Sequence, residues 1–152
     1  MCVIIDANRA SVVFREPPDP DFAPILDWLL QEGGELVFGG RLAAELEGVG
    51  KAKRFLRALV VAGRARRVPD AEVEAEEEVV QRTGYCRSDD PHVIALARRS
   101  GARTLCTEDR DLFRDFRDLR LVKPKGSIYR NRTHAHLLRH TNSCGRLSRR
   151  RR

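Results

Sequence analysis

Short apolar runs alternate with longer amphipathic segments along most of the chain. The runs have the length of strands buried on both faces of a parallel sheet, and the segments between them have helical periodicity. The strands are expected at residues 3–5, 36–38, 66–68, 103–106 and 119–122. The helices are expected at residues 10–14, 21–31, 41–47, 51–61, 71–82, 91–100 and 111–116. This alternation predicts an α/β fold with a mostly parallel sheet of about five strands and helices on both faces.

Composition places the chain among ordinary globular proteins. Its 152 residues are 41% hydrophobic and 34% charged, which suits one domain with its own core. No apolar run approaches the length that spans a bilayer, and Asp6 interrupts the first apolar stretch before it reaches the length of a secretory signal. We therefore expect a cytoplasmic protein without a membrane partner.

The charge is divided unevenly along the chain. Residues 1–122 hold 19 basic and 22 acidic side chains, whereas residues 123–152 hold ten basic and no acidic ones. We expect a domain over 1–122 followed by a basic, partly ordered tail over 123–152. An acidic body with a basic tail favours a polyanionic partner such as nucleic acid.

Four carboxylates are expected to meet at one edge of the sheet. Asp6 follows the first strand and Asp109 follows the fourth, and the carboxyl ends of parallel strands share one edge. Asp90 stands at a helix start, and Glu45 lies beside the apolar face of the helix after the second strand. Both helices can bring these side chains to the same edge.

Each acid also has a simpler structural role open to it. Asp6 can cap the next turn or pair with an arginine, Asp90 and Asp109 are good helix N-caps, and Glu45 can be a surface residue. Together, however, like charges in one cleft repel one another unless a cation lies between them. Carboxylate oxygens with no histidine or cysteine among them favour Mg²⁺ or Mn²⁺ over zinc. Such ions activate water for attack on a phosphodiester.

Four segments, in order and spacing, resemble the PIN domain family. They are residues 3–8, VIIDAN; residues 41–46, RLAAEL; residues 90–97, DPHVIALA; and residues 107–112, TEDRDL. The family includes VapC-like toxins of toxin–antitoxin pairs and other metal-dependent ribonucleases. The resemblance covers about residues 1–122 and implies a three-layer α/β/α sandwich.

The resemblance also implies roles for individual residues. The catalytic and metal-binding acids would be Asp6, Glu45, Asp90 and Asp109. Asn8 would steady the loop after the first strand, and Thr107 would orient the turn before the last helix. Three alternatives remain open: Glu47 in place of Glu45, and Asp89 or Asp111 as auxiliary ligands.

The expected function is that of a Mg²⁺- or Mn²⁺-dependent endoribonuclease, with the toxin of a toxin–antitoxin pair as one biological role. RNA would be the substrate, an antitoxin a protein partner, and a homodimer the expected assembly. Two alternatives remain. The chain can be a non-catalytic nucleic-acid-binding module whose acids are caps and ion-pair partners, or a PIN-like nuclease acting on structured DNA.

The basic tail supplies candidate phosphate contacts. These are Lys123, Lys125, Arg130, Arg132, Arg149, Arg150, Arg151 and Arg152. Residues 128–129 and 137–138 are apolar enough to anchor a short strand and helix to the body, and the alternative is a disordered, solubilising tail. His136 and His140 have helical ligand spacing, but no second ligand cluster supports a transition-metal site there.

Overall fold

The protein folds around one parallel sheet in a computed structural model that describes residues 2–139. The strand order is β3-β2-β1-β4-β5, and every neighbouring pair is parallel. The strands are β1 (Cys2–Ile5), β2 (Glu35–Gly39), β3 (Ala65–Val68), β4 (Thr104–Cys106) and β5 (Ser127–Tyr129). The α/β fold with a parallel sheet of five strands is thus confirmed.

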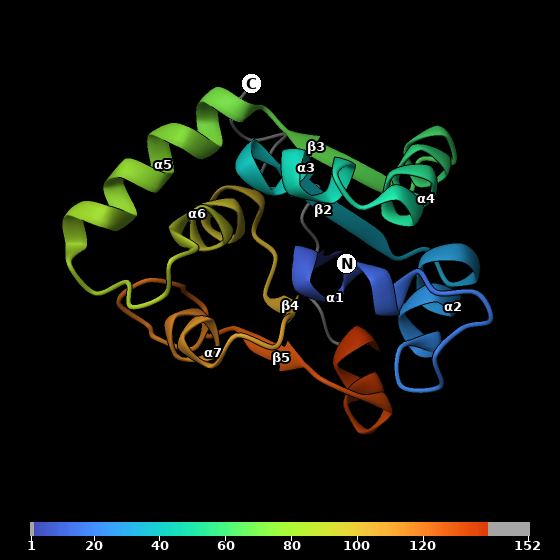
Figure 1. Cartoon of the computed structure of the whole chain (residues 1–152). Helices are drawn as coiled ribbons and strands as arrows, with labels where there is room; N and C mark the ends of the chain where they lie inside the picture. Colours follow the sequence, from blue (N-terminus) through green and yellow to red (C-terminus); the bar gives the residue numbers. More distant parts are fainter. Residues whose placement is uncertain (1, 140–152) are drawn as a thin grey trace.

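Helices cover both faces of the sheet. They are α1 (Ala7–Val13), α2 (Ala23–Gln31), α3 (Gly40–Glu47), α4 (Gly50–Val61), α5 (Asp70–Thr83), α6 (Pro91–Ser100), α7 (Arg110–Phe116) and the 3-10 helix η1 (Arg132–Arg139). Figure 1 shows α5, α6 and α7 on one side of the sheet and α1, α2 and α4 on the other. Helix α3 contacts α1, α4, α5 and α6, so it joins the two layers.

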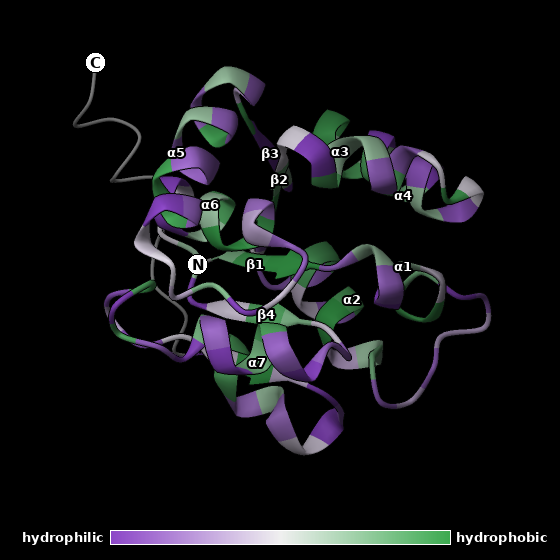
Figure 2. Cartoon of the chain, turned by 60° about the vertical axis from the view of Figure 1, so that its left-hand side comes forward, coloured by the Kyte–Doolittle hydropathy of each residue, from purple (hydrophilic) through white to green (hydrophobic). Residues whose placement is uncertain are grey.

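Strand β1 lies at the centre of the sheet because its apolar run must be buried on both faces. Val3, Ile4 and Ile5 are completely buried, and Figure 2 shows the hydrophobic colour concentrated on the inner elements while polar colour covers the outer helix turns. The chain leaves β1 toward β2 and leaves β4 toward β5, so the strand order reverses between β1 and β4. Ligands of α/β sheets bind in the crevice at such a reversal. Asp6 stands at this point, and its amide nitrogen donates to the carbonyl oxygen of Cys106 at 2.9 Å.

Two glycines make the sharp turn from β2 into α3. A Cβ on Gly39 would lie 2.5 Å from the carbonyl oxygen of Val68, and Gly40 has a left-handed φ of 56°. Larger residues would therefore clash or be strained at this turn. The tight turn starts α3 immediately above the carboxyl end of the sheet, which carries Glu45 toward β1.

The prediction of a fifth strand at residues 119–122 is wrong. The amides of Leu121 and Val122 both donate to the carbonyl oxygen of Asp118, so this segment closes a turn while its apolar side chains at 121–122 are buried. The fifth strand is formed by Ser127–Tyr129, which pairs with β4. Residues 128–129 and 137–138 do contribute a short strand and a helix to the folded body, as expected, with Leu138 buried in η1.

No helix within residues 2–139 is long and apolar enough to cross a membrane. The arginines at positions 149–152, like His140, lie outside the described residues.

Candidate metal centre

Asp6 is the innermost acid of the site. It is 5% exposed and begins α1, yet its carboxylate makes no capping bond to that helix. Instead the hydroxyl of Thr107 donates to Asp6 Oδ2 at 2.7 Å. The Thr107 oxygen in turn accepts hydrogen bonds from the amide of Asp109, at 3.2 Å, and from Asn8 Nδ2, at 3.4 Å. Thr107 therefore links the ends of β1 and β4 and holds Asp6 and Asp109 on one edge.

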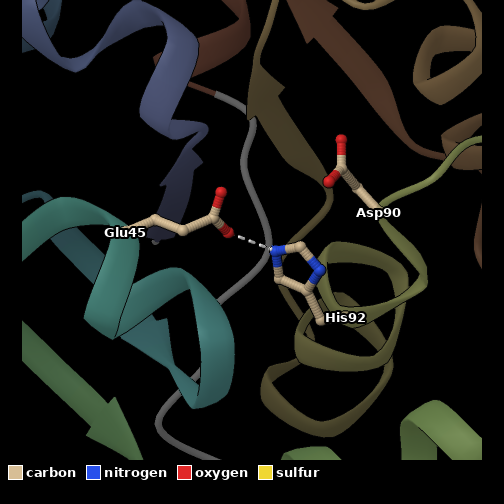
Figure 3. Close-up of side chains that lie close together, drawn as sticks. All are labelled: Glu45, Asp90 and His92. Atoms are coloured by element: carbon tan, nitrogen blue, oxygen red, sulfur yellow. Dashed lines mark hydrogen bonds and ion pairs between the residues drawn. The ribbon is translucent and has the colours of Figure 1, made fainter.

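Glu45, Asp90 and His92 form the second half of the site. One ligand atom from each lies within 4.8 Å of the other two, and Glu45 Oε1 is 2.7 Å from His92 Nε2. Figure 3 shows the Glu45 side chain reaching from α3 toward the start of α6, where Asp90 and His92 stand. The expectation that no histidine lies among the acids is thus wrong, because His92 joins the cluster.

The surroundings of His92 indicate its tautomer. The ring is 1% exposed, and Nδ1 is buried without a hydrogen-bond partner among the described residues. A buried nitrogen that carries a proton but lacks an acceptor costs about 1–3 kcal/mol. The neutral ring with its proton on Nε2 avoids that cost and donates to Glu45. The other carboxylate oxygen of Glu45 is left for a ligand.

A helix-capping role explains the hydrogen bonds of the Asp109 side chain, but the Asp90 side chain has no such role. Asp109 Oδ1 accepts from the amides of Asp111 and Leu112, as an N-cap should, and Oδ2 has no hydrogen bond from the described residues. Asp90 precedes α6, but its carboxylate makes no capping bond. A capping role therefore does not account for the Asp90 side chain.

The shifted pKa values of Asp6 and Asp90 also indicate that the acids lie near one another. The pKa of Asp6 is raised first by burial, and the charges of Asp90 and Glu45 raise it further. Burial likewise raises the pKa of Asp90, with added repulsion from Glu45, Asp109 and Asp89. The hydrogen bond from Thr107 opposes the rise in pKa at Asp6. Asp90 thus lies within electrostatic reach of each of the other three predicted acids.

The neighbouring acids have other surroundings. Glu47 faces Arg67, with an ion-pair distance of 3.9 Å, so α3 directs Glu45 and not Glu47 toward Asp90. Asp111 is exposed, and its amide donates to Asp109. Asp89 is exposed beside Asp90. We therefore describe the site by its four inner acids and His92.

A buried aspartate outside the site holds the loop that carries Asp90. Asp115 on α7 is 2% exposed, and its carboxylate accepts from the amides of Arg87 and Ser88 at 2.9–3.1 Å. The Cys86 thiol also lies 3.3 Å from Asp115 Oδ2. This role was not predicted from the sequence, where its only signal is an acid next to the buried Phe116.

The basic residues expected to contact nucleic acid lie apart from the acids. Lys123, Lys125, Arg130 and Arg132 are all exposed around β5 and the start of η1. Among them, Arg130 lines the same cavity as Thr107, which brings it to the border of the acid site.

The donor set fits a hard divalent cation. Glu45 and Asp90 cluster with His92, whereas Asp6 and Asp109 lie outside that cluster but within electrostatic reach of Asp90. Two of the four carboxylates have a raised pKa, and free oxygens remain on Glu45, Asp90 and Asp109 among the described contacts. Carboxylate oxygens are what Mg²⁺ and Mn²⁺ prefer, and one imidazole is compatible with Mn²⁺. A doubly charged ion would reverse the repulsion that the acids now impose on one another.

Comparison with solved structures agrees with the fold. The crystal structure of VapBC2 from Rickettsia felis bound to a DNA fragment from their promoter contains a chain that matches at a TM-score of 0.53 and 15% identity. The match covers 86% of the present chain and 99% of that one. The FitAcB structure from Neisseria gonorrhoeae matches 70% of the chain and 87% of its own, at 26% identity and a TM-score of 0.41. No protein-family model and no curated protein matches. The PIN-like architecture expected from the sequence is confirmed at the level of the fold.

Proposed function

We propose that this protein is a divalent-metal-dependent endoribonuclease whose active site is the cluster of Asp6, Glu45, Asp90 and Asp109. The observation that carries the proposal is the cluster of Glu45, Asp90 and His92, in which Asp90 is free of any capping bond. Asp6, at the reversal of strand order, and Asp109 lie within electrostatic reach of Asp90 and support it. Mg²⁺ or Mn²⁺ held there would supply Lewis-acid activation of water and of the phosphodiester.

The remaining roles belong to the chain itself. Thr107 keeps the Asp6 carboxylate in place by donating to Oδ2, and His92 does the same for Glu45 through Nε2. The amides at the start of α7 fix Asp109. Ligands held in this way need little reorganisation when a cation binds, which favours both affinity and catalysis.

A role as the toxin of a toxin–antitoxin pair is the biological form of this proposal. The fold match is to a chain of a VapBC2 complex, and that complex is bound to promoter DNA. A cytoplasmic location, an antitoxin partner and a homodimer are the accompanying proposals. They rest on the PIN-like fold and on the sequence motifs.

Cleavage of single-stranded RNA tests the proposed function. The parent protein should cleave a labelled RNA when Mn²⁺ is added and not in EDTA. Asp6→Asn and Asp90→Asn should each lower the rate by about 100-fold or more, because each removes one negative charge from the ion's ligands. Asp27→Asn, at an exposed position of α2, is the matched control and should cleave like the parent.

The same assay separates the alternatives. Structured DNA assayed in parallel should be cleaved more slowly than RNA; the reverse order would assign the chain to DNA instead. Undiminished cleavage in both Asn variants would end the nuclease assignment to this site. Binding of RNA without any cleavage would favour the alternative that the chain is a non-catalytic nucleic-acid-binding module.

A further inference from the structure

A basic cavity shares a wall with the acid site. It has a volume of about 330 Å³, and Arg9, Arg110 and Arg130 line it together with Thr107. Thr107 belongs to both features, because its hydroxyl donates to Asp6 Oδ2. A group that enters this cavity is therefore adjacent to the carboxylates.

The cavity has an excess of positive charge. The acid in its lining is Glu108, which forms an ion pair with Arg9. Arg110 and Arg130 have no ion-pair partner among the described residues. Arg9 is held under the surface with its guanidinium 5.1 Å from the centre of the Phe22 ring, and its Nε is buried without a hydrogen-bond partner among residues 2–139. These features suit an anion, and arginine is adapted to phosphate oxygens.

A second basic cavity borders the first at Arg130. It has a volume of about 470 Å³ and is lined by Arg117, Lys125 and His134. Arg130 lines both cavities, and its guanidinium lies 5.1 Å from the centre of the Phe113 ring, on the wall of the second. The two cavities are therefore neighbours that share Arg130 as a wall, and together they are called the basic groove, with linings from α7, β5 and η1.

The groove offers charge rather than stacking surfaces. Its aromatic side chains are almost fully buried: Phe22 is 5% exposed, Phe113 8% and Tyr129 0%. Bases cannot stack on rings that are covered in this way, whereas phosphates can reach the exposed guanidinium groups of Arg110 and Arg130. Recognition along the groove would be through the sugar–phosphate backbone.

We propose that this groove, defined by Arg9, Arg110, Arg130, Arg117 and Lys125, binds the phosphates of a single-stranded RNA on one side of the bond at the acid site. The acids repel a polyanion, and the arginines beside Thr107 offset that repulsion for the adjoining phosphate. A cavity of this size admits one phosphate with its ribose. The proposal rests on the proposed nuclease function for the position of the cut, but binding can be measured without it.

Binding in EDTA tests the groove, because no cleavage is expected without metal. Fluorescence anisotropy of a labelled single-stranded RNA is measured against KCl concentration for the parent and for Arg110→Gln/Arg130→Gln. The double variant should bind about 10-fold more weakly, and its slope of log K against log[KCl] should fall by about 1.4, since two phosphate contacts are lost. Arg114→Gln, also on α7 but lining neither cavity, is the matched control and should change affinity less than about 2-fold.

Cleavage kinetics provide a second readout in the same variants. With Mn²⁺, the double variant should raise KM about 10-fold and keep kcat within about 2-fold, because the substituted residues lie outside the acid site. Circular dichroism checks that both variants fold, and both substituted residues are exposed.

The outcomes separate this inference from the proposed function. If RNA binds through Arg110 and Arg130 but is never cleaved, the result supports the groove and contradicts the proposed nuclease function. Cleavage that is unaffected by the double substitution, or no detectable binding by the parent, overturns the groove. If the double variant loses affinity for duplex DNA and for single-stranded RNA by the same factor, the single-strand assignment is overturned, because the groove then binds any polyanion.

Discussion

At the scale of single residues, two of the acids stand at element ends without serving the elements as caps. Asp6 follows a fully buried strand, and Asp90 precedes a helix that it does not cap. Asp6, Asp90 and Asp109 were chosen as candidate ligands from their places at strand and helix ends, and Glu45 from its place beside an apolar helix face. His92 was not, because a histidine within an apolar helical run looks the same whether it fills the core or contacts Glu45. Only the packing of α6 against α3 distinguishes the two.

The charge of Asp90 should destabilise the metal-free protein. Burial and neighbouring acids raise its pKa in the folded state, so between the ordinary and the raised pKa the folded protein binds more protons than the unfolded chain. Stability from this group is therefore lost as pH rises through that interval. Asp90→Asn should increase the free energy of unfolding at pH 7 by about 0.5–1 kcal/mol, a small value because solvent screens a partly exposed group.

Urea unfolding of the parent and Asp90→Asn, in EDTA, at a series of pH values measures this effect. The gain should shrink as pH falls toward the ordinary pKa of an aspartate. A variant that is less stable at pH 7, or a difference independent of pH, would contradict the proposed crowding of charge.

His92 should matter for metal affinity through its contact with Glu45. His92→Leu removes the donor to Glu45 Oε1, and loss of a group that orients a ligand typically weakens metal binding about 10-fold. His92→Gln keeps a side-chain donor and should weaken Mn²⁺ binding less. Equal Mn²⁺ dissociation constants for the parent and the Leu variant would show that this contact does not position Glu45.

At the scale of elements, strand β5 shows that a short apolar run does not by itself predict where a strand forms. Residues 119–122 and Ser127–Tyr129 are equally plausible strands by hydrophobicity, but Asp118 accepts the amide of Arg120 and starts a turn. Gly126 then passes so close to Phe116 that a Cβ would lie 2.2 Å from its ring. Turn chemistry and close packing therefore favour the later segment, and neither is visible in the hydrophobic pattern.

Asp115 should be critical for the loop before α6. Asp115→Asn replaces an oxygen that accepts backbone amides by an NH₂ group, so buried donors would face one another. We expect a loss of about 2–4 kcal/mol in the free energy of unfolding. Asp111→Asn, at an exposed position of the same helix, should change it by less than about 0.5 kcal/mol. Urea midpoints of the two variants compare them directly, and equal midpoints would remove the structural role assigned to Asp115.

At the scale of the whole molecule, topology brings the acids together. Helices α1 and α2 lie on one face of the sheet and α6 and α7 on the other, and the loops after the parallel neighbours β1 and β4 open at the same edge. The basic groove begins at Thr107, on the same crevice. A negative site and a positive groove are thus adjacent, and Arg9 and Arg110 of the groove follow Asp6 and Asp109 closely in the chain.

The central claim is that this crevice binds a divalent cation through Asp6, Glu45, Asp90 and Asp109. Calorimetric titration of Mn²⁺ at pH 7 into the parent, Asp6→Asn, Asp90→Asn and the Asp27→Asn control tests it most directly. The parent and the control should bind Mn²⁺ with the same affinity, and each site variant should bind at least about 10-fold more weakly. Equal affinity in all four proteins, or no binding by the parent, would contradict the claim.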